Sequence, residues 1–206
     1  MLKRLILAFL IFAAMTSQSQ DGIAQPADGH DCIDRVDDYL SLDFWTFDQD
    51  PERGWRAILM TPGCELAAAD LIADYHRNLR ERGAPVIVDH PQGQHTISPD
   101  GRVFILYWHE GQIRAFEEQT DRAIDLFGKS IKPDSESYQG WNEYVLASIA
   151  FLEKDLEELK TQRSLLATKE GGMQINLGVI DGLIACFEKS YADAYGSVEC
   201  NRRPTQ

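Results

Sequence analysis

The sequence predicts an all-α fold made of stacked antiparallel helix pairs. From Asp31 onward, apolar residues recur mostly at intervals of three and four, the spacing of one helix face. Long runs of strict alternation, the pattern of half-buried strands, are missing. Prolines and glycines fall between the periodic segments, where helices begin and end. We expect one domain over residues 31–200, followed by a polar tail at 201–206.

The first residues have the layout of an export signal. Lys3 and Arg4 precede an apolar run, Leu5–Ala14, and small and polar residues follow it. The run is shorter than the ~20 residues of a membrane-spanning helix, although a membrane anchor is the alternative interpretation. We expect a signal peptide at residues 1–24, a disordered segment at 25–30, and a periplasmic or secreted mature protein.

The first helices of the domain should be short. At the start of the domain, Ile33, Val36 and Leu40 form one short apolar stripe. A second helix should start at Asp50-Pro51, with a capping acid and a proline in its first turn. Its buried face would comprise Trp55, Ile58 and Leu59, and Pro62-Gly63 would end it.

The aromatic segment Leu42–Trp55 contains Phe44, Trp45 and Phe47 among acidic residues. We expect these side chains, with Trp55, to cap the open end of the helix stack, because a terminal helix pair must cover its neighbour's core. The alternative is a binding surface for a basic partner.

A longer helix should run from Cys64 to Gly83, with basic residues in its last turn and the glycine just beyond it. Its inward face would comprise Leu66, Ala69, Ile72 or Ala73, and Tyr75. The segment 84–101 interrupts the helical pattern. Val86–Val88 is short enough for a strand, but nearby prolines and glycines and the lack of a matching partner favour an ordered loop.

The remaining chain predicts further helix pairs. Lys132-Pro133 should close the first pair, Asp155 should cap the second helix of the next pair, and Gly171-Gly172 should break the chain. These helices are expected at residues 102–116, 119–131, 138–153, 156–168 and, as one or two helices, 175–195.

Four cysteines, an even number behind an export signal, predict disulfides. Three pairings are possible. Proximity in the sequence favours Cys32 with Cys64 and Cys186 with Cys200, one bridge at each end of the domain. A metal site would need closely spaced ligands such as CxxC, and this spacing does not occur, so we expect no metal.

The charge balance limits the partners. The chain has 33 acidic and 20 basic residues and a net charge of −13. Such a surface repels phosphate backbones and anionic lipid headgroups, so we expect neither nucleic-acid binding nor membrane binding after signal cleavage. A basic partner remains compatible with this charge.

Residues 104–134 resemble one tetratricopeptide repeat (TPR), a helix pair of about 34 residues. The large, small, alanine, aromatic and second small positions of that pattern are occupied by Tyr107, Gly111, Ala123, Phe127 and Ser130. Gly111 and Ala123 would let the two helices approach closely, and Phe127 would fill the gap to the next pair. The departures are an early proline, Pro133, and two polar residues, Glu110 and Arg114, at positions that prefer apolar side chains.

The resemblance implies a concave helical surface that binds a protein or peptide. Trp141 lies 34 residues after Tyr107, so a second, degenerate repeat would follow the first. The candidate partner-binding residues are Tyr107, His109, Gln112 and Arg114 on the first helix of the matched repeat, and Asn142 and Tyr144 on the next pair.

Catalysis is not expected from the histidines. His109 and Glu110 are consecutive on a helix, so their side chains diverge by about 100°. The sequence after Glu110 also lacks the second histidine of an HExxH metalloprotease. His90 and His95 with Asp89 are expected to lie in a solvated connector. No phosphate loop or GxSxG motif occurs, and we expect no cofactor.

The sequence therefore predicts an exported, non-catalytic interaction or scaffold module. Two alternatives come from other classes of protein. One is an acidic inhibitor or immunity-like protein that neutralises a basic enzyme. The other is a hydrolase that uses His90, His95 or His109 with a nearby carboxylate.

Overall fold

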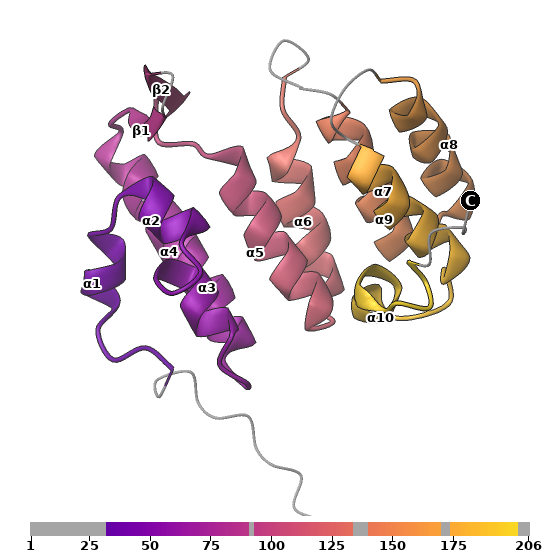
Figure 1. Cartoon of the computed structure of the whole chain (residues 1–206), viewed down its shortest axis with the longest axis horizontal. Coiled ribbons are helices and arrows are strands. Elements are labelled where there is room, and N and C mark those ends of the chain that lie inside the picture. Colours follow the sequence, from indigo (N-terminus) through magenta and orange to yellow (C-terminus); the bar gives the residue numbers. More distant parts are fainter. Residues whose placement is uncertain (1–31, 91–92, 134–139, 170–173, 202–206) are drawn as a thin grey trace, which may run out of the picture.

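The computed structural model describes residues 32–90, 93–133, 140–169 and 174–201, and it is mostly helical (Figure 1). The expected signal peptide, the segment 25–30 and the tail beyond Asn201 lie outside these residues. The helices are α1 (Val36–Leu40), α2 (Phe44–Gln49), α3 (Gly54–Leu59), α4 (Glu65–Arg82), α5 (Phe104–Phe116), α6 (Thr120–Ser130), α7 (Trp141–Leu152), α8 (Leu156–Ala167), α9 (Gln174–Ala185) and α10 (Tyr191–Gly196). Between α4 and α5 lies a hairpin of β1 (Val86–His90) and β2 (Gly93–Ser98).

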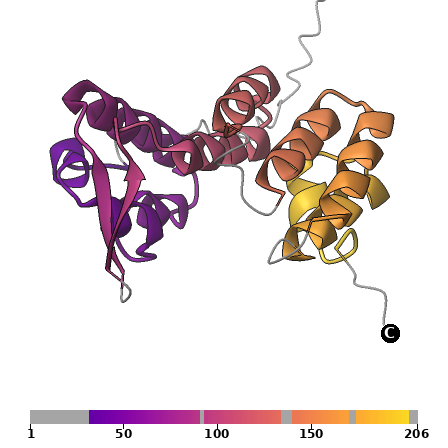
Figure 2. The ribbon, with the colours of Figure 1, turned by 90° about the horizontal axis from the view of Figure 1, so that it is seen from above.

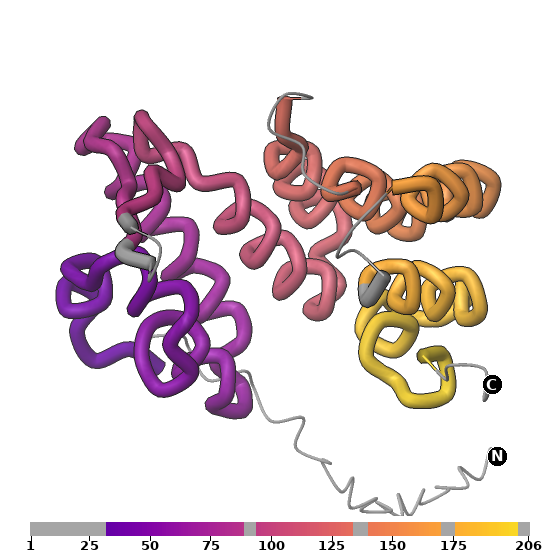
Figure 3. Tube along the Cα trace, turned by 45° about the horizontal axis from the view of Figure 1, so that its top comes forward, coloured from indigo at the N-terminus to yellow at the C-terminus, as the bar shows by residue number. Residues whose placement is uncertain are grey.

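The elements form an arch (Figure 2). Helices α1–α4 and the hairpin make one end, α5 and α6 the middle, and α7–α10 the other end, as the tube of Figure 3 also shows. From α3 to α9, each helix packs on the next along the chain. The mostly helical structure agrees with the predicted all-α class. In the described part of the chain, no helix has both the length and the apolar character needed to cross a membrane.

The hairpin corrects the expected loop at 84–101. Strand β1 pairs with β2 in antiparallel fashion, with Val88 opposite His95. The partner strand escaped prediction because its sequence, GQHTIS, is largely polar. Ladder hydrogen bonds join backbones, so β2 needs no apolar side chains of its own. Burial of Val86 and Val88 against the first helices holds the hairpin in place.

The start of the domain also differs from prediction. Residues 44–49 form a helix, α2, whose start is capped by Asp43: its carboxylate accepts the Thr46 N–H at 3.0 Å. Helix α3 begins at Gly54, not at Asp50-Pro51. The Asp50 carboxylate instead accepts the Glu52 N–H at 2.9 Å and so shapes the turn between the two helices.

Helix α4 ends at Arg82, just before Gly83, as predicted. The backbone of Gly83 is in the left-handed region. Ala69, Ile72 and Tyr75 are buried, but Leu66 is exposed, so that part of the prediction was wrong. The apolar stripe of α4 includes Ala68 and leaves Leu66, near the start of the helix, on the opposite side.

The later helices agree with prediction. Asp155 caps α8 by accepting the Glu158 N–H at 2.9 Å. The segment 175–195 contains two helices, α9 and α10. The break expected at Gly171-Gly172 lies outside the described residues.

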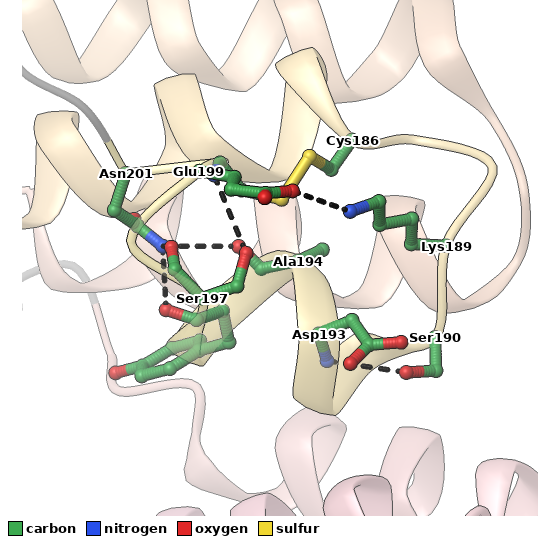
Figure 4. Close-up of a disulfide and its surroundings, with 10 residues drawn as sticks. Cys186, Lys189, Ser190, Asp193, Ala194, Ser197, Glu199 and Asn201 are labelled. Carbon is green, nitrogen blue, oxygen red and sulfur yellow. Dashed lines mark hydrogen bonds and ion pairs between the residues drawn. A yellow bond between two sulfur atoms is a disulfide. The ribbon is translucent and has the colours of Figure 1, made fainter.

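Both predicted disulfides are present. Cys32 pairs with Cys64 and Cys186 with Cys200, one pair near each end of the arch. The second bridge joins the end of α9 to the segment after α10 (Figure 4). Beside it, the Asn201 side-chain amide donates to the carbonyl oxygens of Ala194, Tyr195 and Ser197, at 2.9 to 3.2 Å. The disulfides indicate an oxidising environment outside the cytoplasm.

The buried side chains form two clusters that meet at α5. Leu106 and Ile113 lie in the first cluster, with α2–α4 and the hairpin. Trp108 and Ala115 lie in the second, with α6–α10. Helix α5 therefore contributes to both cores.

Candidate functional site

The contact between α5 and α6 involves the residues of the matched repeat. Ala123 and Phe127 are fully buried. Gly111 lies so close to Phe127 that a Cβ added to it would be 2.7 Å from the Phe127 ring. The Phe127 ring stacks on Trp108, with centroids 4.6 Å apart. These side chains belong to the packing between helices and are not accessible to a partner.

His109 lies on the side of α5 that faces the first helices. Its Nε2 is 3.6 Å from the Asp48 carboxylate, and its ring centroid is 5.1 Å from that of Trp55. Only 14% of the His109 side chain is exposed, so most of it is buried between helices. Burial lowers the pKa of His109, aided by the nearby Arg56 cation, while Asp48 and a hydrogen bond with Gln112 oppose that shift. The lowered pKa favours the neutral form of the imidazole.

Glu110 points to other elements. Its carboxylate lies 3.2 Å from Arg122 on α6 and 3.5 Å from Arg114. Burial raises the pKa of Glu110, and the two guanidinium groups oppose this. His109 and Glu110 thus have separate partners, as their adjacent positions on a helix predict.

Asp48 is a buried acid that the sequence analysis did not single out. Its carboxylate accepts the Trp55 indole N–H at 3.1 Å and the Gln49 amide at 2.5 Å. A signal existed in the sequence, because Asp48 follows Phe44 and Phe47 at the spacing of one buried helix face. Its burial shows that a carboxylate takes part in the core beneath His109.

Arg56 on α3 adjoins this group. Its Nε–H donates to the Asp48 carbonyl at 2.6 Å, and its guanidinium lies 4.2 Å from the Trp55 ring centroid. Among the half-buried arginines of the described residues, Arg114 and Arg163 form ion pairs with carboxylates, and Arg56 forms none. Its charge is therefore not neutralised by an ion pair in the described part of the chain.

Gln112, one turn after His109, connects α5 to the other end of the arch. Its side-chain amide donates to the Tyr195 hydroxyl on α10 at 3.0 Å. The Tyr195 hydroxyl lies 2.7 Å from that of Tyr144. Phe116 continues the same side of α5, with its ring centroid 5.5 Å from that of Tyr195.

We call Arg56, His109, Gln112, Phe116 and Tyr195 the inner face. These side chains come from α3, α5 and α10, and each is partly exposed. Figure 2 shows α3 and α10 on the same side of the α5–α6 pair. The inner face combines a cation, an imidazole, an amide, a phenol and an apolar ring, groups that bind by hydrogen bonding and stacking.

The six predicted partner-binding residues do not all lie together. His109 and Gln112 are on the inner face. Tyr107 instead lies against His76 on α4, at 4.4 Å between ring centroids. Arg114 is paired with Asp70 and Glu110 between α4, α5 and α6.

The other two predicted residues have structural roles. The Asn142 side chain bonds both the N–H and the carbonyl of Lys132, at 3.0 and 2.9 Å, and so holds the segment after α6. Tyr144 is only 3% exposed. Helical periodicity places such residues on a helix face, but only the packing decides what that face meets.

The aromatic segment Leu42–Trp55 divides in two. Phe44, Phe47 and Trp55 are buried in the first core, and Phe47 stacks on Tyr75 with centroids 3.6 Å apart. Trp45 is 56% exposed. Three of the four aromatic side chains therefore cover the core, as the capping interpretation expects.

His90 and His95, expected in a loop, lie in the hairpin. Asp89 and His90 belong to β1 and His95 to β2. Within residues 32–90, 93–133, 140–169 and 174–201, no group of three or more His, Cys, Asp or Glu side chains is arranged to hold a metal ion. Among the described residues, the partners of His109 are the Asp48 carboxylate, the Trp55 indole and the Gln112 amide.

Comparisons of this chain with protein-family models, with curated proteins and with solved structures found no match.

Proposed function

We propose that this chain is an exported interaction module, periplasmic or secreted, that binds a protein or peptide on its inner face. In this proposal it acts as a TPR-like scaffold and not as a catalyst. The disulfides support the exported location, because such bonds persist in oxidising compartments.

One observation carries the proposal. His109 and Gln112, one turn apart on α5, contact α2 and α3 on one side and α10 on the other. Three segments far apart in the sequence thus contribute partly exposed polar and aromatic groups to one side of the arch. Aromatic and arginine side chains are the residues that most often dominate binding energy at protein interfaces.

The partner should contact Phe116 and should not contact the outer side of α8. We would replace Phe116 with the photo-reactive residue benzoylphenylalanine, which conserves an aromatic ring, and irradiate the protein in its producing cells. The matched control carries the same residue at Lys160, an exposed position on α8.

A discrete cross-linked product at Phe116 that is absent at Lys160 supports the proposal. The product should weaken when Gln112 is replaced by alanine, whereas the far-UV circular dichroism of that variant stays unchanged. Equal cross-linking at both positions, or none at Phe116, would exclude the inner face as the binding surface.

A further inference from the structure

The segment between the hairpin and α5 is joined to α4 at one histidine. We call residues 99–103 the strap; it follows β2 and ends at Val103, which is 1% exposed. The Val103 N–H donates to the Nε2 atom of His76 on α4 at 3.1 Å. His76 is itself buried, and its ring makes an edge-to-face contact with Tyr107 on α5, with centroids 4.4 Å apart. One side chain of α4 therefore holds the last residue of the strap and contacts the start of α5.

The strap lies close to the backbone of α4. Gly101 has a φ of +79°, and a Cβ added to it would clash with the carbonyl group of Leu79. The hairpin before the strap covers the first core with Val86 and Val88. Because Ser98, the last residue of β2, pairs with Val86, movement of the strap away from α4 would also move the base of the hairpin.

The hydrogen bond between the strap and α4 requires an unprotonated Nε2 on His76. A protonated imidazole carries an N–H on both nitrogens, so it cannot accept the Val103 N–H. Burial disfavours the proton as well, and the charged groups that act on the pKa of His76 among the described residues are two cations, Arg80 on α4 and Arg102 on the strap. The Asp100 carboxylate of the strap instead accepts the Arg102 N–H at 3.1 Å. A proton on His76 would therefore break the contact and place a third cation beside two arginines.

From this geometry we propose that His76 is an acid-sensitive switch, whose protonation releases the strap and the base of the hairpin from α4. Burial foremost, and then Arg80 and Arg102, lowers the pKa of His76 to about 4, whereas an imidazole released to solvent regains its ordinary value of 6.5. The closed form is therefore most stable above pH 6.5, and it loses stability as the pH falls towards 4. The inference goes beyond the proposed function and does not depend on it, because the strap and the hairpin are not part of the inner face.

Amide hydrogen exchange of the oxidised protein, followed by ¹H–¹⁵N NMR at pH 7.5 and pH 5, measures the release at Val103. The protection factor corrects for the direct effect of pH on exchange. For Val103 it should fall about 30-fold between these two pH values, as the pKa values of the closed and open forms require. At pH 5 the amides of α8, which packs in the second core, should remain better protected than Val103.

Two variants separate His76 from other titrating groups. His76→Gln retains an amide oxygen that can accept the Val103 N–H but takes up no proton, so protection at Val103 should be the same at both pH values. The matched control is His95→Gln, at an exposed position on β2, which should keep the full response to acid.

A measurement on the wild type needs no variant to fold. The imidazole ¹⁵N resonances of His76 should titrate below pH 5, together with the amide resonance of Val103. Titration of His76 near pH 6.5 would mean that its ring is not held between the strap and α4.

Three results would overturn the inference. The first is that titration near pH 6.5. The second is an undiminished fall in Val103 protection in a folded His76→Gln variant. The third is equal protection of Val103 and α8 at pH 5, which would mean that acid unfolds the whole chain and does not release the strap by itself.

Discussion

Replacing Gly111 with alanine tests the close contact between α5 and α6. The added Cβ would lie 2.7 and 2.8 Å from two atoms of the Phe127 ring and 3.3 Å from the Cβ of Leu126. Phe127 is fully buried and stacks on Trp108, so its ring has little room to move. Overpacking of this kind costs about 1–3 kcal/mol.

The control is Gly128→Ala on α6. A Cβ at Gly128 meets no atom within 4 Å, so this variant gains only the helix propensity of alanine, about 1 kcal/mol. Gly111→Ala gains the same helix propensity, but it also introduces the clash with Phe127. Gly111→Ala should therefore be less stable than Gly128→Ala by about 1–3 kcal/mol, because the difference isolates the overpacking.

Urea unfolding of the oxidised protein, followed by circular dichroism, measures both variants. Adding Phe127→Leu to Gly111→Ala should relieve the clash, with a coupling energy of about 1 kcal/mol in a double-mutant cycle. If Gly111→Ala proves as stable as Gly128→Ala, the two helices are not in close contact at this position. The assignment of Gly111 and Phe127 to the packing between helices would then be wrong.

Two further predictions concern acid and reduction. His76 is buried and accepts the Val103 N–H at 3.1 Å; burial foremost, then Arg80 and Arg102, lowers its pKa to about 4 from 6.5. As the pH falls, His76 is protonated in the unfolded chain before it is protonated in the folded one. The contribution of His76 to the free energy of unfolding is therefore fully present above pH 6.5 and falls as the pH drops towards 4, by about 2 kcal/mol at pH 5. His76→Gln should show a shallower loss in urea midpoints between pH 7 and 5, and equal slopes would contradict this. Replacing Cys186 and Cys200 with serine should lower the free energy of unfolding by about 3 kcal/mol. Amide hydrogen exchange should become faster in α10 but not in α4. An equal change in both helices would mean that the bridge does not stabilise α10 in particular.

The sequence alone determined the features that depend on local chemistry. Helical periodicity gave the helical class, Asp155 gave the start of α8, and Gly83 gave the end of α4. The cysteine pairing also followed from the sequence, because partners close along the chain close short loops. Each of these features depends on neighbours within a few turns or on one short loop.

The tertiary structure alone decided which helix faces meet. Periodicity put Tyr144 and Gln112 on helices, but packing buried Tyr144 in the second core and left Gln112 partly exposed, beside Tyr195. Strand β2 could not be predicted from its largely polar sequence, because it is defined by the pairing of its backbone with β1. The group of Asp48, Arg56 and His109 is formed by three helices, and the sequence separation of its members hides it. A one-dimensional pattern records which face of an element is apolar, whereas the neighbour that covers this face is selected by the packing of the whole chain.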